Sequence, residues 1–124
     1  MFTGIVEEIG MIDRMTTEQN VIKMTIACQT IIEDMHIGDS ISVNGACLTV
    51  TSFDSSSFDV NVIKGTEDKT YLSQLTKGNR VNLERAMPSQ GRFGGHFVLG
   101  HVDEVGSIIK IRPSANSNIV TVQC

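Results

Sequence analysis

Residues 40–53 read Ser-Ile-Ser-Val-Asn-Gly-Ala-Cys-Leu-Thr-Val-Thr-Ser-Phe and contain a sharp turn between two apolar runs. Asn44 and Gly45 are residue types that accept the left-handed backbone of a tight β-turn. The flanking segments, Ser40–Val43 and Cys47–Phe53, are apolar and rich in β-branched residues, so both are predicted as strands. The rest of the chain has the same pattern of short strands separated by turns.

Five further segments are predicted as strands. Val21–Cys28, Phe58–Ile63 and Arg80–Arg85 alternate residue by residue, as half-buried strands do. Phe2–Ile12 is predicted as a strand with bends or bulges at its glycines. His96–Val105 is predicted as a last long strand.

Two short helical segments are predicted between these strands. Ile31–Met35 has room for a single turn, and Thr66–Leu75 is predicted as a helix because Thr66 can cap it and acidic residues fill its first turn. About six strands with one or two short helices indicate one all-β domain. A closed barrel is the architecture we expect, since closure removes exposed sheet edges.

Charge and composition exclude several classes of protein. The chain of 124 residues has a formal net charge of −4 and no Lys/Arg cluster, so we expect no nucleic-acid partner. Its apolar runs are short and Met1–Gly10 does not resemble a secretion signal, so we expect a cytoplasmic protein without membrane contact. The cysteines form no C-x-x-C pair and are expected to be free thiols: Cys28, Cys47 and Cys124. The histidines lack metal-ligand spacing, so no metal site is predicted: His36, His96 and His101.

An internal repeat relates the two ends of the chain. At an offset of 96 positions, Gly4-Ile-Val-Glu-Glu-Ile-Gly10 aligns with Gly100-His-Val-Asp-Glu-Val-Gly106. The same offset also aligns Ile12 with Ile108, Thr25 with Thr121, Ile26 with Val122 and Cys28 with Cys124. We therefore interpret residues 1–97 as one complete barrel and residues 98–124 as a linker with the first strands of an incomplete second barrel. Two strands alone are marginally stable, so this second part is expected to need a partner surface.

Cys47 and Thr49 are the first candidates for binding chemistry. They lie two positions apart on a predicted strand, so their side chains share one face and could line a pocket. The alternative is that Cys47 is a small buried apolar residue, as free cysteines often are.

The glycine-rich segment 91–101 supplies two imidazoles, and His is the side chain best suited to proton transfer near neutral pH. On one regular strand His96 and His101 would face opposite sides, so at most one of them points into a given pocket. The alternative is a glycine-rich turn with one surface and one structural histidine. The acidic pairs Glu7-Glu8 and Asp103-Glu104 are interpreted as solvated charges, because adjacent strand residues cannot form a carboxylate dyad.

Four motifs together resemble the α-type riboflavin synthases: Met1–Gly10, Val43–Val50, Val81–Ala86 and Gly94–Asp103. The resemblance implies two similar six-stranded Greek-key barrels, a C-terminal helix and a homotrimer in a protein nearly twice this length. It implies the dismutation of two 6,7-dimethyl-8-ribityllumazine molecules to riboflavin and 5-amino-6-(ribitylamino)uracil, without metal or organic cofactor. The protein would hold two heterocycles face to face and move protons.

The same resemblance implies a set of site residues in this chain. Cys47 is implied as a nucleophile or contact at the lumazine C7, and His101 as a proton shuttle. The substrate-binding residues that it implies are Gly4, Ile5, Val6, Ser40, Cys47, Leu48, Thr49, Asn61, Val62, Ile63, Lys64, Gly65, Thr66, Gly100, His101 and Val102. Lys64-Gly65-Thr66 stands where the family usually has Pro-Glu-Thr, so a carboxylate is missing there.

Two functions remain open after the resemblance. If the chain is a fragment with one barrel, we expect it to bind lumazine and riboflavin with little activity alone, and a homodimer could imitate the pairing of two barrels. The alternative is a non-catalytic lumazine- or flavin-binding protein of the antenna type. Such proteins typically lose parts of the Cys-Leu-Thr motif and of the glycine–histidine run, and this chain keeps both.

Overall fold

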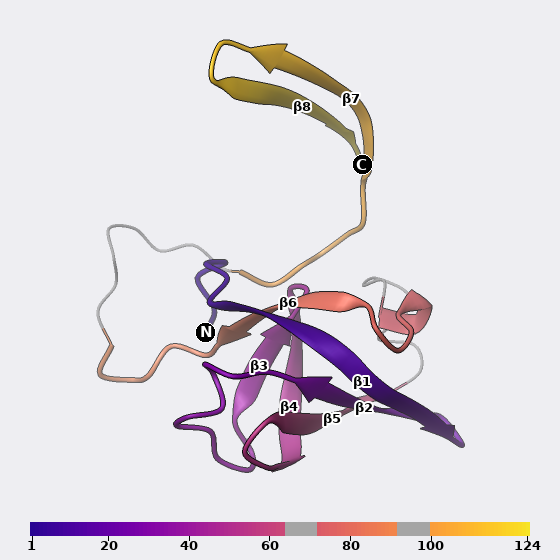
Figure 1. The fold of residues 1–124 in the computed structure, drawn as a ribbon, viewed down its shortest axis with the longest axis vertical. Coiled ribbons are helices and arrows are strands. Elements are labelled where there is room, and N and C mark those ends of the chain that lie inside the picture. Colours follow the sequence, from indigo (N-terminus) through magenta and orange to yellow (C-terminus); the bar gives the residue numbers. More distant parts are fainter. Residues whose placement is uncertain (64–71, 92–99) are drawn as a thin grey trace.

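The computed structural model of the chain describes residues 1–63, 72–91 and 100–124 (Figure 1). Among these residues, the regular elements are strands, apart from one short 3-10 helix, η2 (Leu72–Gln74), as the predicted all-β class requires. Within these ranges, no helix is long and apolar enough to cross a membrane. The strands are β1 (Glu8–Glu18), β2 (Val21–Ala27), β3 (Ser40–Val43), β4 (Ala46–Phe53), β5 (Ser57–Ile63), β6 (Arg80–Arg85), β7 (Ser107–Ser114) and β8 (Ser117–Gln123).

Strands β1–β6 form the closed six-stranded barrel that the sequence predicts. Their order around the barrel is β1-β2-β5-β4-β3-β6, and antiparallel pairing of β1 with β6 closes it. The pairings of β2 with β5 and of β3 with β6 join strands that are not consecutive, as in a Greek key. Figure 1 shows these strands curling around a common centre, with the β7–β8 hairpin standing apart from them.

The turn between β3 and β4 is the two-residue turn that Asn44 and Gly45 predict. Both residues have positive φ angles, 50° at Asn44 and 86° at Gly45, and Val43 pairs directly with Ala46 across the turn. Positive φ at both central positions is the geometry whose twist matches that of the flanking strands. The turn therefore sets the register of this hairpin.

The core of the barrel is built from the inward side chains of the alternating strands. On β4, Ala46, Leu48 and Val50 are buried, while Cys47 and Thr49 are exposed on the outside. Burying each large apolar side chain contributes about 1.5–3 kcal/mol. The largest fully buried side chains are Phe2, Phe58, Ile12, Met24, Ile26, Ile31, Ile41, Leu72, Leu83, Val43, Val50 and Val60.

Two predicted strands differ from what the structure contains. Phe2–Ile12 is a strand only from Glu8 onward, because the segment before it bends at Gly4, where φ is +82°. The described part of His96–Val105, residues 100–105, is not a strand. Its backbone donors bond to loop carbonyls instead of a neighbouring ladder, as the site description below details.

The structure describes one of the two predicted helical segments in full and only the end of the other. Residues 31–34 form a turn in which Glu33 N–H bonds to Thr30 O, without a helical element. Of the segment Thr66–Leu75, only residues 72–75 are described, and they contain the single turn η2. The remainder of that prediction lies outside the described residues.

The β7–β8 hairpin repeats β1–β2 at the offset of 96 positions. Ile108 pairs with Val122 as Ile12 pairs with Ile26, and in both hairpins a register shift follows at once. The residue with positive φ in the turn, Ala115, also has its counterpart in Gln19. The sequence repeat is therefore a repeat of strand register, bulge and turn.

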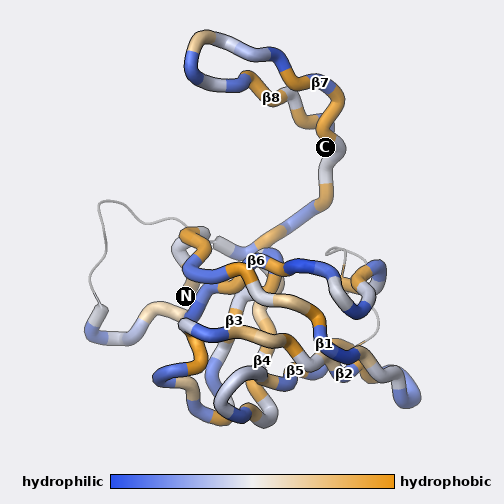
Figure 2. Tube along the Cα trace, in the orientation of Figure 1, coloured by the Kyte–Doolittle hydropathy of each residue, from blue (hydrophilic) through white to orange (hydrophobic). Residues whose placement is uncertain are grey.

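Unlike β1–β2, the β7–β8 hairpin keeps its apolar side chains exposed. Figure 2 shows hydrophobic stretches on both strands of this hairpin. The exposed residues are Ile108, Ile109, Ile111, Ile119, Val120 and Val122.

We predict that Phe58→Ala lowers the free energy of unfolding by about 3–5 kcal/mol, because it opens a cavity in the barrel core. Phe58 is 0% exposed, whereas its cross-strand partner Phe53 is 42% exposed and is the matched control. Phe53→Ala is expected to cost under about 1 kcal/mol. Urea denaturation of both variants measures the difference, and equal losses would contradict the inward placement of Phe58.

Candidate functional site

A row of small polar side chains crosses β3 and β4 on the outside of the barrel. Ser42 pairs with Cys47 and Ser40 with Thr49, and cross-strand partners share a face. Ile41 and Leu48, which alternate with them, point into the core. We call Ser40, Ser42, Cys47 and Thr49 the outer polar row.

The chain before β1 folds over the neighbouring strand β6 and is held there by a buried carboxylate. Glu84, 6% exposed, pairs with Ser42 and so extends the outer face of β3 onto β6. Its Oε1 accepts the Thr3 N–H at 2.6 Å and the Thr3 hydroxyl at 2.9 Å, and both its oxygens lie close to the Gly4 nitrogen, at 3.1 and 3.0 Å. A carboxylate can be buried only when donors of this kind surround it.

Residues 100–102 lie against the same segment. Gly100 N–H donates to Phe2 O and Val102 N–H donates to Gly45 O, each at 2.9 Å. A Cβ at Gly100 would overlap the backbone of Gly4 and lie 2.8 Å from its Cα, so only glycine allows this approach. The three glycines, Gly4, Gly45 and Gly100, therefore meet at one end of β3.

A small depression, which we call the glycine hollow, opens where these segments meet. Its volume is about 180 Å³. It is lined by Gly4, Val6, Ser42, Asn44, Gly45, Asn82, Leu83, Glu84 and Gly100. A pocket for a drug-sized ligand usually measures about 300–1,000 Å³, so the hollow alone is too small to enclose such a ligand.

His101 lies at the edge of this region and is exposed to solvent. Its ring meets the ring of Phe2 edge-on, with centroids 5.2 Å apart and an interplanar angle of 68°. Because Phe2 is fully buried, this contact gives the imidazole a defined position beside Gly100. His96, the second candidate imidazole, lies outside the described residues.

The structure places most of the predicted site residues that it describes in three groups. Gly4, Val6 and Gly100 line the glycine hollow, with His101 and Val102 beside it. Ser40, Cys47 and Thr49 lie in the outer polar row, and Asn61 and Ile63 are exposed on the adjacent strand β5. The side chains of Leu48 and Val62 lie in the core, so only their backbones could reach an outer ligand. Lys64, Gly65 and Thr66 lie outside the described residues.

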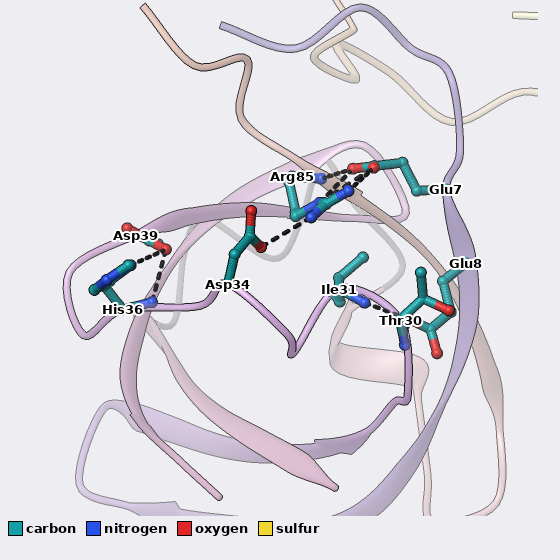
Figure 3. A network of polar contacts seen from close by, with 8 residues as sticks. All are labelled: Glu7, Glu8, Thr30, Ile31, Asp34, His36, Asp39 and Arg85. Carbon is teal, nitrogen blue, oxygen red and sulfur yellow. Dashed lines mark hydrogen bonds and ion pairs between the residues drawn. The ribbon is translucent and has the colours of Figure 1, made fainter. Parts of the chain in front are cut away.

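A second and larger cavity lies on the other side of Glu84, and we call it the arginine cavity. It measures about 750 Å³ and includes Ile5 and Ser40 from the predicted set. Arg85 lies in the wall of this cavity and forms two ion pairs there (Figure 3). Its Nη2 bonds to Glu7 Oε2 at 2.6 Å and its Nη1 bonds to Asp34 Oδ1 at 2.8 Å. Glu84 lines both the glycine hollow and the arginine cavity.

The acidic pair Glu7-Glu8 is less solvated than the sequence predicts. Glu7 binds the Arg85 guanidinium, and Glu8 accepts the backbone N–H groups of Gln29, Thr30 and Ile31 at 2.5, 2.9 and 2.9 Å. These partners lie between 21 and 78 positions away along the chain. No local pattern around either glutamate could have revealed them.

Hydrogen bonding and burial shift the pKa values of Glu7 and Cys28 in opposite directions. Hydrogen bonds from Arg85 lower the pKa of Glu7 below its ordinary value, against the smaller effect of burial. Burial raises the pKa of the Cys28 thiol to about 12, so Cys28 stays protonated and unreactive at neutral pH. Cys47 and Cys124 are exposed free thiols.

In the described part of the chain, no three His, Cys, Asp or Glu side chains are grouped as metal ligands.

Comparison with known proteins matches this chain to a lumazine binding domain and to riboflavin synthases. The family model "Lumazine binding domain" matches residues 3–86. Riboflavin synthase of Bacillus subtilis (strain 168) is 53% identical over 117 residues, which cover 94% of this chain and 54% of that protein. Riboflavin synthase of Schizosaccharomyces pombe (strain 972) is 50% identical over 111 residues, covering 89% of this chain and 53% of that protein. The chain thus spans about half the length of the curated relatives that it matches.

Solved structures with the same fold carry flavin-like ligands. LumP complexed with riboflavin has a TM-score of 0.79 and 27% identity, and the match covers 93% of this chain and 62% of that chain. LumP complexed with 6,7-dimethyl-8-(1'-D-ribityl) lumazine has a TM-score of 0.74 and 25% identity, with 93% and 61% covered.

We predict that Arg85→Gln lowers the free energy of unfolding by about 1 kcal/mol at pH 7, since it removes a bidentate but partly exposed pair. The pKa of Glu7 is lowered by folding, so its contribution is complete above its unfolded value of about 4.3 and is lost as the pH falls through the folded value. The difference between parent and variant should therefore shrink below about pH 4.

Arg80→Gln is the matched control for this prediction. Arg80 lies on the same strand, is exposed, and forms no ion pair among the described residues. Urea denaturation between pH 3 and pH 7 measures both variants, and a pH-independent loss in Arg85→Gln would contradict the role assigned to Glu7.

Proposed function

The chain belongs to the lumazine binding domain family, and on this basis we propose that it binds 6,7-dimethyl-8-ribityllumazine and riboflavin on the outside of the β1–β6 barrel. The observation that carries the proposal is the meeting of the glycine hollow with the outer polar row. Gly4 and Val6 lie there beside Ser42, which pairs across β3 and β4 with Cys47 of the same row. LumP, which shares the fold, has been solved with both kinds of ligand.

We assign the two parts of the site to the two parts of the ligand. The flat heterocycle suits the apolar and backbone surface of the N-terminal segment, where Ile5 and Val6 are exposed. The ribityl hydroxyls suit the outer polar row and Asn61, which offer donors and acceptors. The proposed contacts are Gly4, Ile5, Val6, Ser40, Cys47, Leu48, Thr49, Asn61, Val62, Ile63, Lys64, Gly65, Thr66, Gly100, His101 and Val102, with Leu48 and Val62 acting through their backbones.

For the whole protein, we propose the activity of the relatives that share half of their length with this chain, that of a riboflavin synthase. In this dismutation one lumazine gives a four-carbon unit to a second, and riboflavin and a pyrimidine are formed. His101 is the proposed proton shuttle, supported by its exposure and its contact with Phe2. Cys47 is the proposed nucleophile or contact at C7, supported by its exposure on the outer polar row. The reaction as proposed needs no cofactor.

The proposed organisation follows the repeat. Residues 1–97 form the lumazine-binding barrel, and residues 98–124 form a linker and the first strands of a second barrel, because β7–β8 repeats the register of β1–β2. We propose a homotrimer for the whole protein and a homodimer for this chain alone. The free thiols suit a reducing compartment, so the cytoplasm is the proposed location.

Titration of the purified chain with 6,7-dimethyl-8-ribityllumazine, followed by ligand fluorescence, tests the proposal. Saturable binding weakened by His101→Gln is the expected result, with little riboflavin formed. A folded chain without saturable binding would contradict it. Binding with no turnover in the full-length protein that contains this chain would favour the alternative, a non-catalytic binding protein of the antenna type.

We predict that bound lumazine slows the alkylation of Cys47 by iodoacetamide at least about tenfold at saturation, since a ligand over the outer polar row covers that thiol. Cys124, which is exposed and directly follows β8, is the internal control and should react at an unchanged rate. Cys28 should stay unmodified because burial holds its pKa at about 12. Mass spectrometry of the peptides measures all three, and unprotected Cys47 at saturation would contradict the proposed site.

A further inference from the structure

We propose that Glu84 is a positioning residue of the ligand site: its buried carboxylate holds the segment Thr3–Ile5 so that the next amide, that of Val6, faces the ligand. The inference rests on the proposed function, because it concerns the same site. It adds a residue that contacts no proposed ligand atom and that local sequence patterns do not single out.

The first step is the set of donors that Glu84 and Thr3 occupy. Glu84 accepts the N–H groups of Thr3 and Gly4 together with the Thr3 hydroxyl. The same hydroxyl oxygen accepts the Ile5 N–H at 3.3 Å. Three consecutive backbone N–H groups are therefore bound within the protein.

The second step concerns the donor that is left. Beyond these three, Glu7 N–H donates to Leu83 O at 2.9 Å at the start of the barrel pairing. Between them, the Val6 N–H has no acceptor among the described residues, and the Val6 side chain is exposed beside the glycine hollow. A ligand that carries a ring carbonyl or ring nitrogen can accept this N–H, which otherwise bonds only to water.

The third step is the place of Glu84 in the fold. It lies on β6, the strand that pairs with both β1 and β3, and it lines both the glycine hollow and the arginine cavity. Gly100 packs directly on Gly4, so a shift of the N-terminal segment also moves residues 100–102. Loss of the carboxylate would therefore disturb both walls of the hollow without opening the barrel core.

Glu8 supplies a matched control within the same chain. Its carboxylate accepts three backbone N–H groups, those of Gln29, Thr30 and Ile31, and Figure 3 shows Glu8 beside Thr30 and Ile31. None of these three residues lines the glycine hollow. Glu84→Gln and Glu8→Gln make the same chemical change to a carboxylate with the same kind of partners. A merely structural role predicts lower stability in both variants and unchanged binding in both.

The experiment measures riboflavin affinity by fluorescence, with urea denaturation run alongside, for the full chain and both variants. We expect Glu84→Gln to raise the Kd roughly tenfold, because the neutral amide holds Thr3–Ile5 less firmly and the Val6 N–H loses its position, and Glu8→Gln to change it less than about twofold. Thr3→Val, which leaves the barrel and Glu84 intact, should raise the Kd in the same direction and keeps the test available if Glu84→Gln does not fold. Unchanged affinity in Glu84→Gln or, failing that, in Thr3→Val would overturn the inference.

Hydrogen exchange of the free protein separates this inference from the proposed function. The Thr3 and Gly4 amides should be protected in the parent chain and should exchange faster in Glu84→Gln, with or without ligand. Unprotected amides in the parent would overturn the positioning role. Protected amides in a parent chain that binds neither riboflavin nor lumazine would contradict the proposed function and leave the Glu84 contact established.

Discussion

The candidate site depends on one buried carboxylate. Glu84 places a carboxylate on the outer face of β6, where the residue is only 6% exposed. Burying such a charge is costly unless hydrogen-bond donors surround it. The donors come from Thr3 and Gly4, which precede the first strand. This one contact therefore places the N-terminal segment over the barrel, and Gly100 can then pack against Gly4. Without it, the glycine hollow would have only the wall formed by the barrel itself.

The alternation of strand side chains decides where chemistry can occur in this fold. The barrel interior is filled by apolar side chains, so polar and reactive groups can gather only on its outer face. Cys47 and Thr49 lie outside for the same reason that Leu48 lies inside. A site of this kind is open on one side and shallow, as the volume of about 180 Å³ for the glycine hollow indicates. A ligand bound there would keep one side exposed to solvent unless a second surface covered the outer face of the barrel.

The sequence predicts the regular parts of the molecule well, because local patterns determine them. Alternation located the barrel strands, Asn44-Gly45 located the tight turn, and the repeat at 96 positions anticipated the shared register of the two hairpins. The failures involve contacts between distant residues. The contact of Glu84 with Thr3 spans 81 positions and that of Arg85 with Glu7 spans 78, and no local signal reports either. The sequence predicts a bend at Gly4, but it does not predict that the residues before Glu8 bond to Glu84 instead of a strand ladder.

The central claim is that ligands bind on the outer polar row beside the glycine hollow and reach the arginine cavity only at its edge, where Ile5 and Ser40 lie. Titration of the isotopically labelled chain with riboflavin, followed by backbone amide NMR, tests it most directly. The account predicts that the largest shifts occur at Val6, Thr49 and Gly100, while Met35 and Met87 in the wall of the arginine cavity stay unchanged. Saturable shifts centred on Met35 and Met87 would place the ligand in the arginine cavity and contradict the account.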